Sequence, residues 1–106
     1  MKINIKAGTD LTPSFRKYIE EKLGTLAKFV KRFDETGEAE IWIEISRTTR
    51  HHRKGDVFVA AASLRLPRKV LRAEEYAGDA RAAINRARDT LRLEIEKYKT
   101  RRAAAR

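Results

Sequence analysis

The sequence contains no cysteine, and glycine is scarce, with 5 residues among 106. The lack of cysteine excludes disulfide bonds, thiolate nucleophiles and zinc fingers. The chain has no glycine-rich loop of the kind that holds a nucleotide phosphate, and no Ser-His-Asp set suggests itself. We therefore expect a protein that is not an enzyme and that uses no cofactor, no metal and no small-molecule substrate.

Long apolar runs are also missing. No stretch approaches the roughly 20 apolar residues of a membrane span. The opening segment, MKINIKAG, is typical of a strand rather than of a signal peptide. These absences predict a cytoplasmic protein without a membrane partner. The length of 106 residues suits one domain with one modest core.

What the sequence has in excess is positive charge. It contains 25 Lys and Arg residues against 15 Asp and Glu, which gives a net charge of +10. A surplus of this size is typical of a protein that binds a polyanion. The alternative is a basic surface that serves only solubility. We favour nucleic acid, because such a charge opposes compactness unless a partner uses it.

Hydrophobic periodicity predicts a strand, then a helix, then three strands. Ile3 and Ile5 alternate with polar residues, as in a half-buried strand. Thr12 and Pro13 are typical of a helix start, and apolar residues at helical spacing continue to about Val30. Three further strands are predicted in the segments AEIWIEIS, VFVAAASLRL and KVLRAEE, with PRK as the turn between the last two.

A second helix is expected to close the domain. Asp79 is its predicted N-cap, and an apolar stripe extends from Ala80 to Tyr98. The resulting order β-α-β-β-β-α predicts an α+β fold, with a four-stranded sheet and two helices packed on one face. We expect residues 1–100 to form a single domain and residues 101–106 to form a short basic tail that frays.

Cations line this last helix in two rows. At about 100° per residue, one row beside the apolar stripe consists of Arg81, Arg88, Arg92 and Lys99. A second row, facing more directly away from the stripe, consists of Arg86, Lys97 and Arg101. The alternative is a solvated face with intrahelical ion pairs, to which Asp89, Glu94 and Glu96 contribute. These acids are too few for the cations around them, so we favour phosphate contacts.

Three further features leave alternatives open. Lys22 falls at the edge of the apolar arc near Tyr18 and Phe29, where it either snorkels to water or presents a functional ammonium against an aromatic edge. His51 and His52 lie in a basic loop that either touches phosphates or is simply solvated, and a metal site there is not expected. Trp42 is predicted on the sheet face opposite the isoleucines, where it either stacks on a base or covers strand edges.

Two stretches are the most specific in the chain: LTPSFRKYIEEK at the start of the first helix and LRAEEYAGDARAAI at the entry to the last. Through them, and through the element order over essentially its whole length, the chain resembles the ribosome hibernation-promoting factor family. That family includes the ribosome-associated inhibitor and is also described as ribosomal subunit interface protein. The resemblance implies a fold similar to the double-stranded-RNA-binding domain.

The resemblance also implies a function. Members of this family bind the small ribosomal subunit in the mRNA channel, over the tRNA sites of the decoding centre. They inhibit translation and store idle ribosomes under stress or in stationary phase. Longer members carry a C-terminal dimerisation domain, so this sequence resembles a short form or a segment that ends before that domain. The partner we expect is the ribosomal RNA of the small subunit, and we expect a monomer away from the ribosome.

The resemblance bears on individual residues as well. Arg16 and Lys22 fall on basic positions of the family's first helix, and Lys97 and Lys99 on those of its second, whereas Asn85 stands where the family often has Asp. With the cation rows, this leads to the expected rRNA-binding residues Arg16, Lys22, Lys28, Arg86, Arg88, Arg92, Lys97 and Lys99. Two alternatives stay open: a general double-stranded-RNA-binding module, and a protein-interaction domain that uses the sheet face around Trp42.

Overall fold

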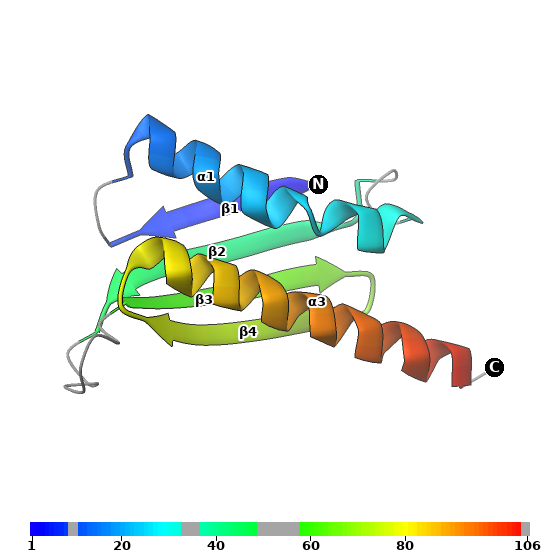
Figure 1. Ribbon diagram of the computed structural model, residues 1–106. Helices are drawn as coiled ribbons and strands as arrows, with labels where there is room; N and C mark the ends of the chain where they lie inside the picture. Colours follow the sequence, from blue (N-terminus) through cyan, green and yellow to red (C-terminus); the bar gives the residue numbers. More distant parts are fainter. Residues whose placement is uncertain (9–10, 33–36, 49–57, 105–106) are drawn as a thin grey trace.

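The computed structural model describes residues 1–8, 11–32, 37–48 and 58–104. Its elements are β1 (Lys2–Ala7), α1 (Pro13–Gly24), the 3-10 helix η1 (Ala27–Val30), β2 (Glu40–Arg47), β3 (Phe58–Leu66), β4 (Lys69–Ala77) and α3 (Ala80–Ala104). They form one four-stranded sheet in the order β1-β2-β3-β4. Both long helices lie on the same face of this sheet (Figure 1). The predicted α+β architecture and element order are confirmed.

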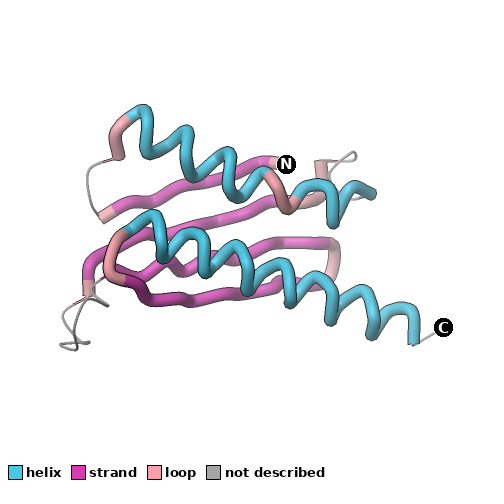
Figure 2. Tube along the Cα trace, viewed as in Figure 1, coloured by secondary structure: helices cyan, strands magenta, loops and turns pink. Residues whose placement is uncertain are grey.

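The sheet is mixed. β1 runs parallel to β2, with Ile3 opposite Ile41, because α1 connects the two strands as a crossover. The other neighbouring pairs are antiparallel. Figure 2 shows the two layers, with the strands in magenta behind the helices in cyan. The strand at each edge of the sheet is therefore β1 on one side and β4 on the other.

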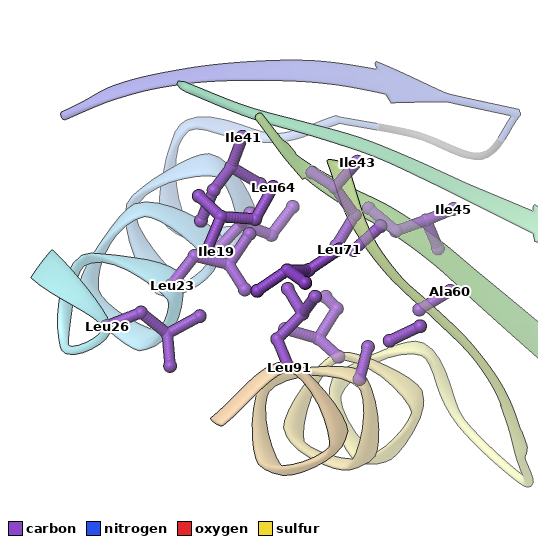
Figure 3. Close-up of a cluster of buried hydrophobic side chains, with 14 of the residues drawn as sticks. Ile19, Leu23, Leu26, Ile41, Ile43, Ile45, Ala60, Leu64, Leu71 and Leu91 are labelled. Carbon is purple, nitrogen blue, oxygen red and sulfur yellow. The ribbon is translucent and has the colours of Figure 1, made fainter. Parts of the chain in front are cut away.

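The hydrophobic core lies between the sheet and the helices. Ile41, Ile43 and Ile45 are buried on the helix side of β2, as their alternation with polar residues predicts. They pack in one cluster with residues that include Ile19 of α1 and Leu91 of α3, as Figure 3 shows. No charged or polar residue is buried within the described part of the chain. The charges are therefore all available at or near the surface.

The first helix begins as predicted but ends earlier. The Thr12 hydroxyl accepts a hydrogen bond from the Phe15 amide at 3.1 Å, and Pro13 occupies the first turn. The prediction of one helix to about Val30 was wrong, because α1 stops at Gly24 and a turn leads into η1. Glycine and threonine are weak helix formers, and the Thr25 hydroxyl donates to the Lys22 carbonyl at 2.6 Å, which favours the break.

The last helix is longer than predicted. Its start is confirmed, since the Asp79 carboxylate accepts a hydrogen bond from the Ala82 amide at 2.8 Å. The frayed tail was wrong for residues 101–104, which continue α3 to Ala104. Arginine and alanine are among the best helix formers, so a basic, alanine-rich end favours continuation of the helix. Residues 105–106 lie outside the described part.

The β3–β4 hairpin turns at Pro67 and Arg68, where the turn was predicted. Arg68 has a φ of 63°, a left-handed conformation that glycine adopts at lower cost. β4 then continues two residues past the predicted end, to Ala77. The expected basic loop with His51 and His52 lies within residues 49–57, outside the described part.

Candidate nucleic-acid interface

The two long helices are joined at their facing flanks by a polar contact. The Asn85 amide of α3 donates a hydrogen bond of 2.7 Å to the Tyr18 hydroxyl of α1. Tyr18 lies on the flank of α1 beside the buried row of Phe15 and Ile19, because it is three residues, nearly one turn, after Phe15. This contact fixes which side of each helix faces the other.

Cations collect around the Tyr18 ring. The Lys22 ammonium lies 5.5 Å from the ring centroid, and the Arg81 guanidinium lies 4.6 Å from it. Each cation at this distance is attracted by the ring electrons, by about 0.5–1 kcal/mol at an exposed site. Lys22 comes from α1 and Arg81 from α3, so the ring holds one charge from each helix. This places the Lys22 ammonium against the Tyr18 ring, while a functional role for it stays a prediction.

A second aromatic ring repeats the arrangement farther along. The Lys28 ammonium lies 5.2 Å from the Phe29 ring centroid, and the Arg92 guanidinium of α3 lies 5.4 Å from it. Together these groups form a mixed basic and aromatic surface between the helices. We call it the helix seam, which consists of Tyr18, Lys22, Lys28, Phe29, Arg81, Asn85, Arg88 and Arg92.

The seam has polar atoms that the protein itself leaves unsatisfied. Asn85 Oδ1 and Arg88 Nε are both buried and have no hydrogen-bond partner among the described residues. The other end of the Arg88 guanidinium pairs with Asp89 at 2.9 Å. Buried polar atoms without partners are uncommon, because each one costs part of its hydration free energy. The seam is therefore less than optimal for stability alone.

The predicted contact residues differ in how far they are engaged. Arg92 pairs with Glu96 at 3.7 Å, and Lys97 pairs with Glu94 at 3.7 Å. By contrast, no carboxylate in the described part lies within 4.0 Å of the charge on Lys22, Lys28 or Arg81. Exposed ion pairs contribute little, typically about 0–1 kcal/mol, so an incoming phosphate can replace them. The unpaired cations are the ones already free to meet an anion.

The structure separates the remaining predicted residues from the seam. Arg86 donates a hydrogen bond to the Tyr76 carbonyl, and Lys97 shares that flank of α3, so both face the β4 side. Arg16 lies on the other flank of α1, about 160° around the helix from Tyr18. Lys99 continues the Arg92 row two turns later, where α3 is exposed. The predicted set is thus not one surface.

Sequence reasoning left several seam residues out of the expected contact set. Arg81 was recognised as part of a cation row but was not carried into that set. Tyr18 and Phe29 were noted only as neighbours of Lys22, and Asn85 only as a departure from a family pattern. The spacing of Tyr18 and Lys22, four residues apart on one helix, was the available signal. The partner across the seam has no signal in a single sequence.

Trp42 lies on the sheet face that the helices leave uncovered, as predicted, and is 46% exposed. Its indole donates a hydrogen bond of 2.8 Å to Glu40. The Arg65 guanidinium lies 5.3 Å from the ring centroid and covers part of it. The Glu40 contact lies within β2 and the Arg65 contact comes from the neighbouring strand β3, so the polar edge and one face of the ring are both engaged.

Among residues 1–8, 11–32, 37–48 and 58–104, no three histidine, aspartate or glutamate side chains are grouped so that they would hold a metal ion. In the same residues, no helix has both the length and the apolar character needed to cross a membrane.

Comparison with known proteins covers nearly the whole chain. The family model described as Sigma 54 modulation protein / S30EA ribosomal protein matches residues 2–103. A ribosome hibernation promotion factor of Deinococcus radiodurans is 33% identical over 92 residues, covering 87% of this chain and 45% of its own. One from Lactococcus lactis subsp. cremoris is 29% identical over 102 residues, covering 95% and 51%. The chain therefore spans about half the length of these relatives.

Solved structures agree on the fold. The N-terminal domain of Thermus thermophilus Protein Y has a TM-score of 0.71 and 27% identity, covering 92% of this chain and 99% of its own. A ribosomal subunit interface protein from Coxiella burnetii has a TM-score of 0.73 and 22% identity, covering 94% and 99%, and supports the fold alone. On the extent of the family match, this chain belongs to the family described as Sigma 54 modulation protein / S30EA ribosomal protein.

Proposed function

We propose that this chain is a ribosome hibernation factor. It binds the small ribosomal subunit in the mRNA channel, over the tRNA sites of the decoding centre, where it inhibits translation and stores idle ribosomes under stress or in stationary phase. The observation that carries the proposal is the helix seam, where each of two aromatic rings holds two cations drawn from facing helices. Relatives named for ribosome hibernation support the choice of partner.

The mechanism is competition for space. Cations of the seam contact phosphates of folded ribosomal RNA, and the domain then occupies the volume that mRNA and tRNA need. Recognition through phosphate position and RNA shape suits a rigid surface, because no base sequence has to be read. The aromatic contacts restrict the long Lys and Arg side chains before binding, so less rotamer entropy is lost on the RNA. No catalysis, cofactor or small-molecule substrate is involved.

The seam is the centre of the proposed contact, with the other predicted residues at its borders. Lys22, Lys28, Arg88 and Arg92 come from the seam itself, and Lys99 extends it along α3. Arg16, Arg86 and Lys97 lie on other flanks and would contact RNA only where it folds around the domain. The protein acts in the cytoplasm, as a monomer away from the ribosome.

The test is co-sedimentation with purified small ribosomal subunits at near-physiological salt, in the presence of excess unrelated RNA duplex. We expect the chain to pellet with the subunit despite the duplex and to be displaced by mRNA with initiator tRNA. A double variant, Lys22→Glu with Arg81→Glu, should abolish pelleting. The control is Lys6→Glu with Lys17→Glu, which reverses the same charge at exposed residues outside the seam.

The alternatives give different results in the same experiment. If the duplex strips the protein from the subunit, the chain is a general double-stranded-RNA binder. If both charge reversals leave pelleting intact and Trp42→Ala abolishes it, the sheet face docks a protein. If affinity for the subunit does not fall with salt, the basic seam is not the interface, since neutralised phosphates release counterions.

A further inference from the structure

A hollow of about 150 Å³ lies on the β4 side of α3, away from the helix seam. Its lining includes Lys69, Val70 and Arg72 at the start of β4 and Glu94, Tyr98 and Arg101 near the end of α3. In Figure 1 the red end of α3 runs past the turn between β3 and β4. We call it the hairpin hollow.

The charge around the hairpin hollow is positive and unpaired. No carboxylate in the described part lies within 4.0 Å of the charged atoms of Lys69, Arg72 or Arg101. The only acid in the lining, Glu94, has Lys97 at 3.7 Å. Three cations around a small concave space concentrate positive electrostatic potential there. An anion is the ligand that this arrangement favours.

The neighbouring turn adds a fourth cation in an unfavourable backbone conformation. Arg68 precedes Lys69 directly, and its φ of 63° is the one positive value at a non-glycine residue in the described part. Glycine would occupy this position with less strain. An arginine kept where glycine fits better suggests that its guanidinium has a use.

The hollow also has an apolar and aromatic side. Val70 is 41% exposed, and Tyr98 is half-buried between the core and the surface. Surfaces that bind single-stranded nucleic acid combine two components: cations that follow the sugar-phosphate backbone, and an aromatic ring on which a base can stack. An acidic peptide would use the cations but would gain little from the ring.

We propose that the hairpin hollow binds a single-stranded RNA segment, with its phosphates on Lys69, Arg72 and Arg101 and an unpaired base against Tyr98. None of these residues belongs to the helix seam. Arg92, the seam residue of α3 nearest to Arg101, is nine residues away from it, which is about 14 Å along the axis at 1.5 Å per residue and about 180° around the helix. The two surfaces therefore contact different stretches of RNA, and the hollow does not depend on the seam or on the ribosome.

The experiment measures fluorescence anisotropy of a labelled oligouridine of about 12 nucleotides against the intact chain over a series of salt concentrations. The triple variant Lys69→Ala, Arg72→Ala, Arg101→Ala removes the hollow's cations. The matched control, Lys2→Ala, Lys6→Ala, Lys17→Ala, removes the same charge from exposed residues outside the hollow. Thermal melts followed by circular dichroism establish that every variant is folded.

For the wild type we expect measurable binding with a steep salt dependence. The triple variant should lower the log–log salt slope by about 2, because each single-strand phosphate contact contributes about 0.7, and affinity at 0.1 M salt should fall up to about a hundredfold. Tyr98→Leu, which keeps an apolar side chain, should weaken binding about tenfold without changing the slope. The control should keep nearly the wild-type slope.

Three results would overturn the proposal. The first is an absence of oligouridine binding by the wild type, and the second is an equal loss in the triple variant and its control. The third is unchanged RNA binding in the triple variant together with loss of binding to a polyglutamate peptide, which would assign the hollow to an acidic protein. Sedimentation with the small subunit is scored separately, so the hollow can fail while the ribosomal function stands, and the reverse.

Discussion

The contact between Asn85 and Tyr18 makes an asymmetric prediction about stability. Tyr18→Phe removes the hydroxyl that accepts the 2.7 Å hydrogen bond, while it keeps the ring that holds Lys22 and Arg81. Asn85→Ala removes the donor instead. Both variants delete the same hydrogen bond, but they leave different groups behind.

The two costs follow from what remains. A net hydrogen bond contributes about 1 kcal/mol, and Tyr18→Phe also leaves every polar atom of the Asn85 side chain without a partner, since Oδ1 already has none. We expect Tyr18→Phe to cost about 1–1.5 kcal/mol. Asn85→Ala removes the unsatisfied Oδ1 as well and introduces a better helix former, which together offset most of the loss. Its expected cost is below about 0.5 kcal/mol.

Urea unfolding measures these differences, with Trp42, the single tryptophan of the chain, as the fluorescence probe. The double variant should cost no more than Asn85→Ala alone, because Tyr18→Phe leaves no unpaired amide behind once Asn85 is removed, and this gives a coupling energy of about 1 kcal/mol for the pair. In thermal melts, Tyr18→Phe should lower Tm by roughly 4–7 °C.

A coupling energy below about 0.3 kcal/mol would show that the two side chains are energetically independent, although they are in hydrogen-bond contact in the structure. An Asn85→Ala variant that is less stable than Tyr18→Phe would refute the reasoning in a different way. In that case Oδ1 has a stabilising interaction, and the seam is better satisfied than its geometry indicates.

Three further predictions concern the sheet, the core and the turn. The pKa of the Glu40 carboxyl is held below its ordinary value of 4.5, mainly by a hydrogen bond from the Trp42 indole and to a smaller extent by one from the Asn4 amide. The contribution of this depressed pKa to stability is present above pH 4.5 and is lost as the pH falls through the folded-state pKa. Trp42→Phe should raise the pKa of Glu40, as measured by carbon-13 NMR titration. An unchanged pKa would exclude the indole as the cause. Leu91→Ala deletes a fully buried side chain and should cost about 3 kcal/mol in urea unfolding, whereas a loss under about 1 kcal/mol would mean that the helices close over the cavity. Arg68→Gly relieves the strain of the positive φ and should raise the free energy of unfolding by roughly 0.5 kcal/mol, after the greater entropy of glycine in the unfolded chain is subtracted. A lower Tm would show that the arginine side chain stabilises the turn.

Local patterns in the sequence were sufficient for most of the fold. Alternation at Ile41, Ile43 and Ile45 predicted a strand with one buried face, because side chains of a strand point to opposite sides. Thr12 and Asp79 predicted both helix starts, because a short polar side chain satisfies amide groups that the first turn leaves free. These features act over a few residues, so a single sequence contains them.

The helix ends were harder to predict, because no local pattern marks them clearly. The apolar stripe of the first helix continues through Leu23, Leu26 and Val30, all of which are buried, although the regular helix stops at Gly24. A turn followed by a 3-10 segment keeps those side chains on the core, so hydrophobic spacing does not distinguish it from a continuous helix. At the other end, residues 101–104 continue α3 although the apolar stripe ends at Tyr98, because arginine and alanine favour the helix.

The sequence by itself determined the charge of this protein, the order of its elements and the row of α3 that contains Arg81, Arg88 and Arg92. Only the tertiary structure decided what those cations face. The contact of Asn85 with Tyr18 turns this row toward α1, and the contact of Arg86 with the Tyr76 carbonyl turns the opposite row toward β4. Helical periodicity specifies angles around one axis, but the positions of neighbouring elements come from long-range packing. For that reason one basic helix contributes to two separate surfaces.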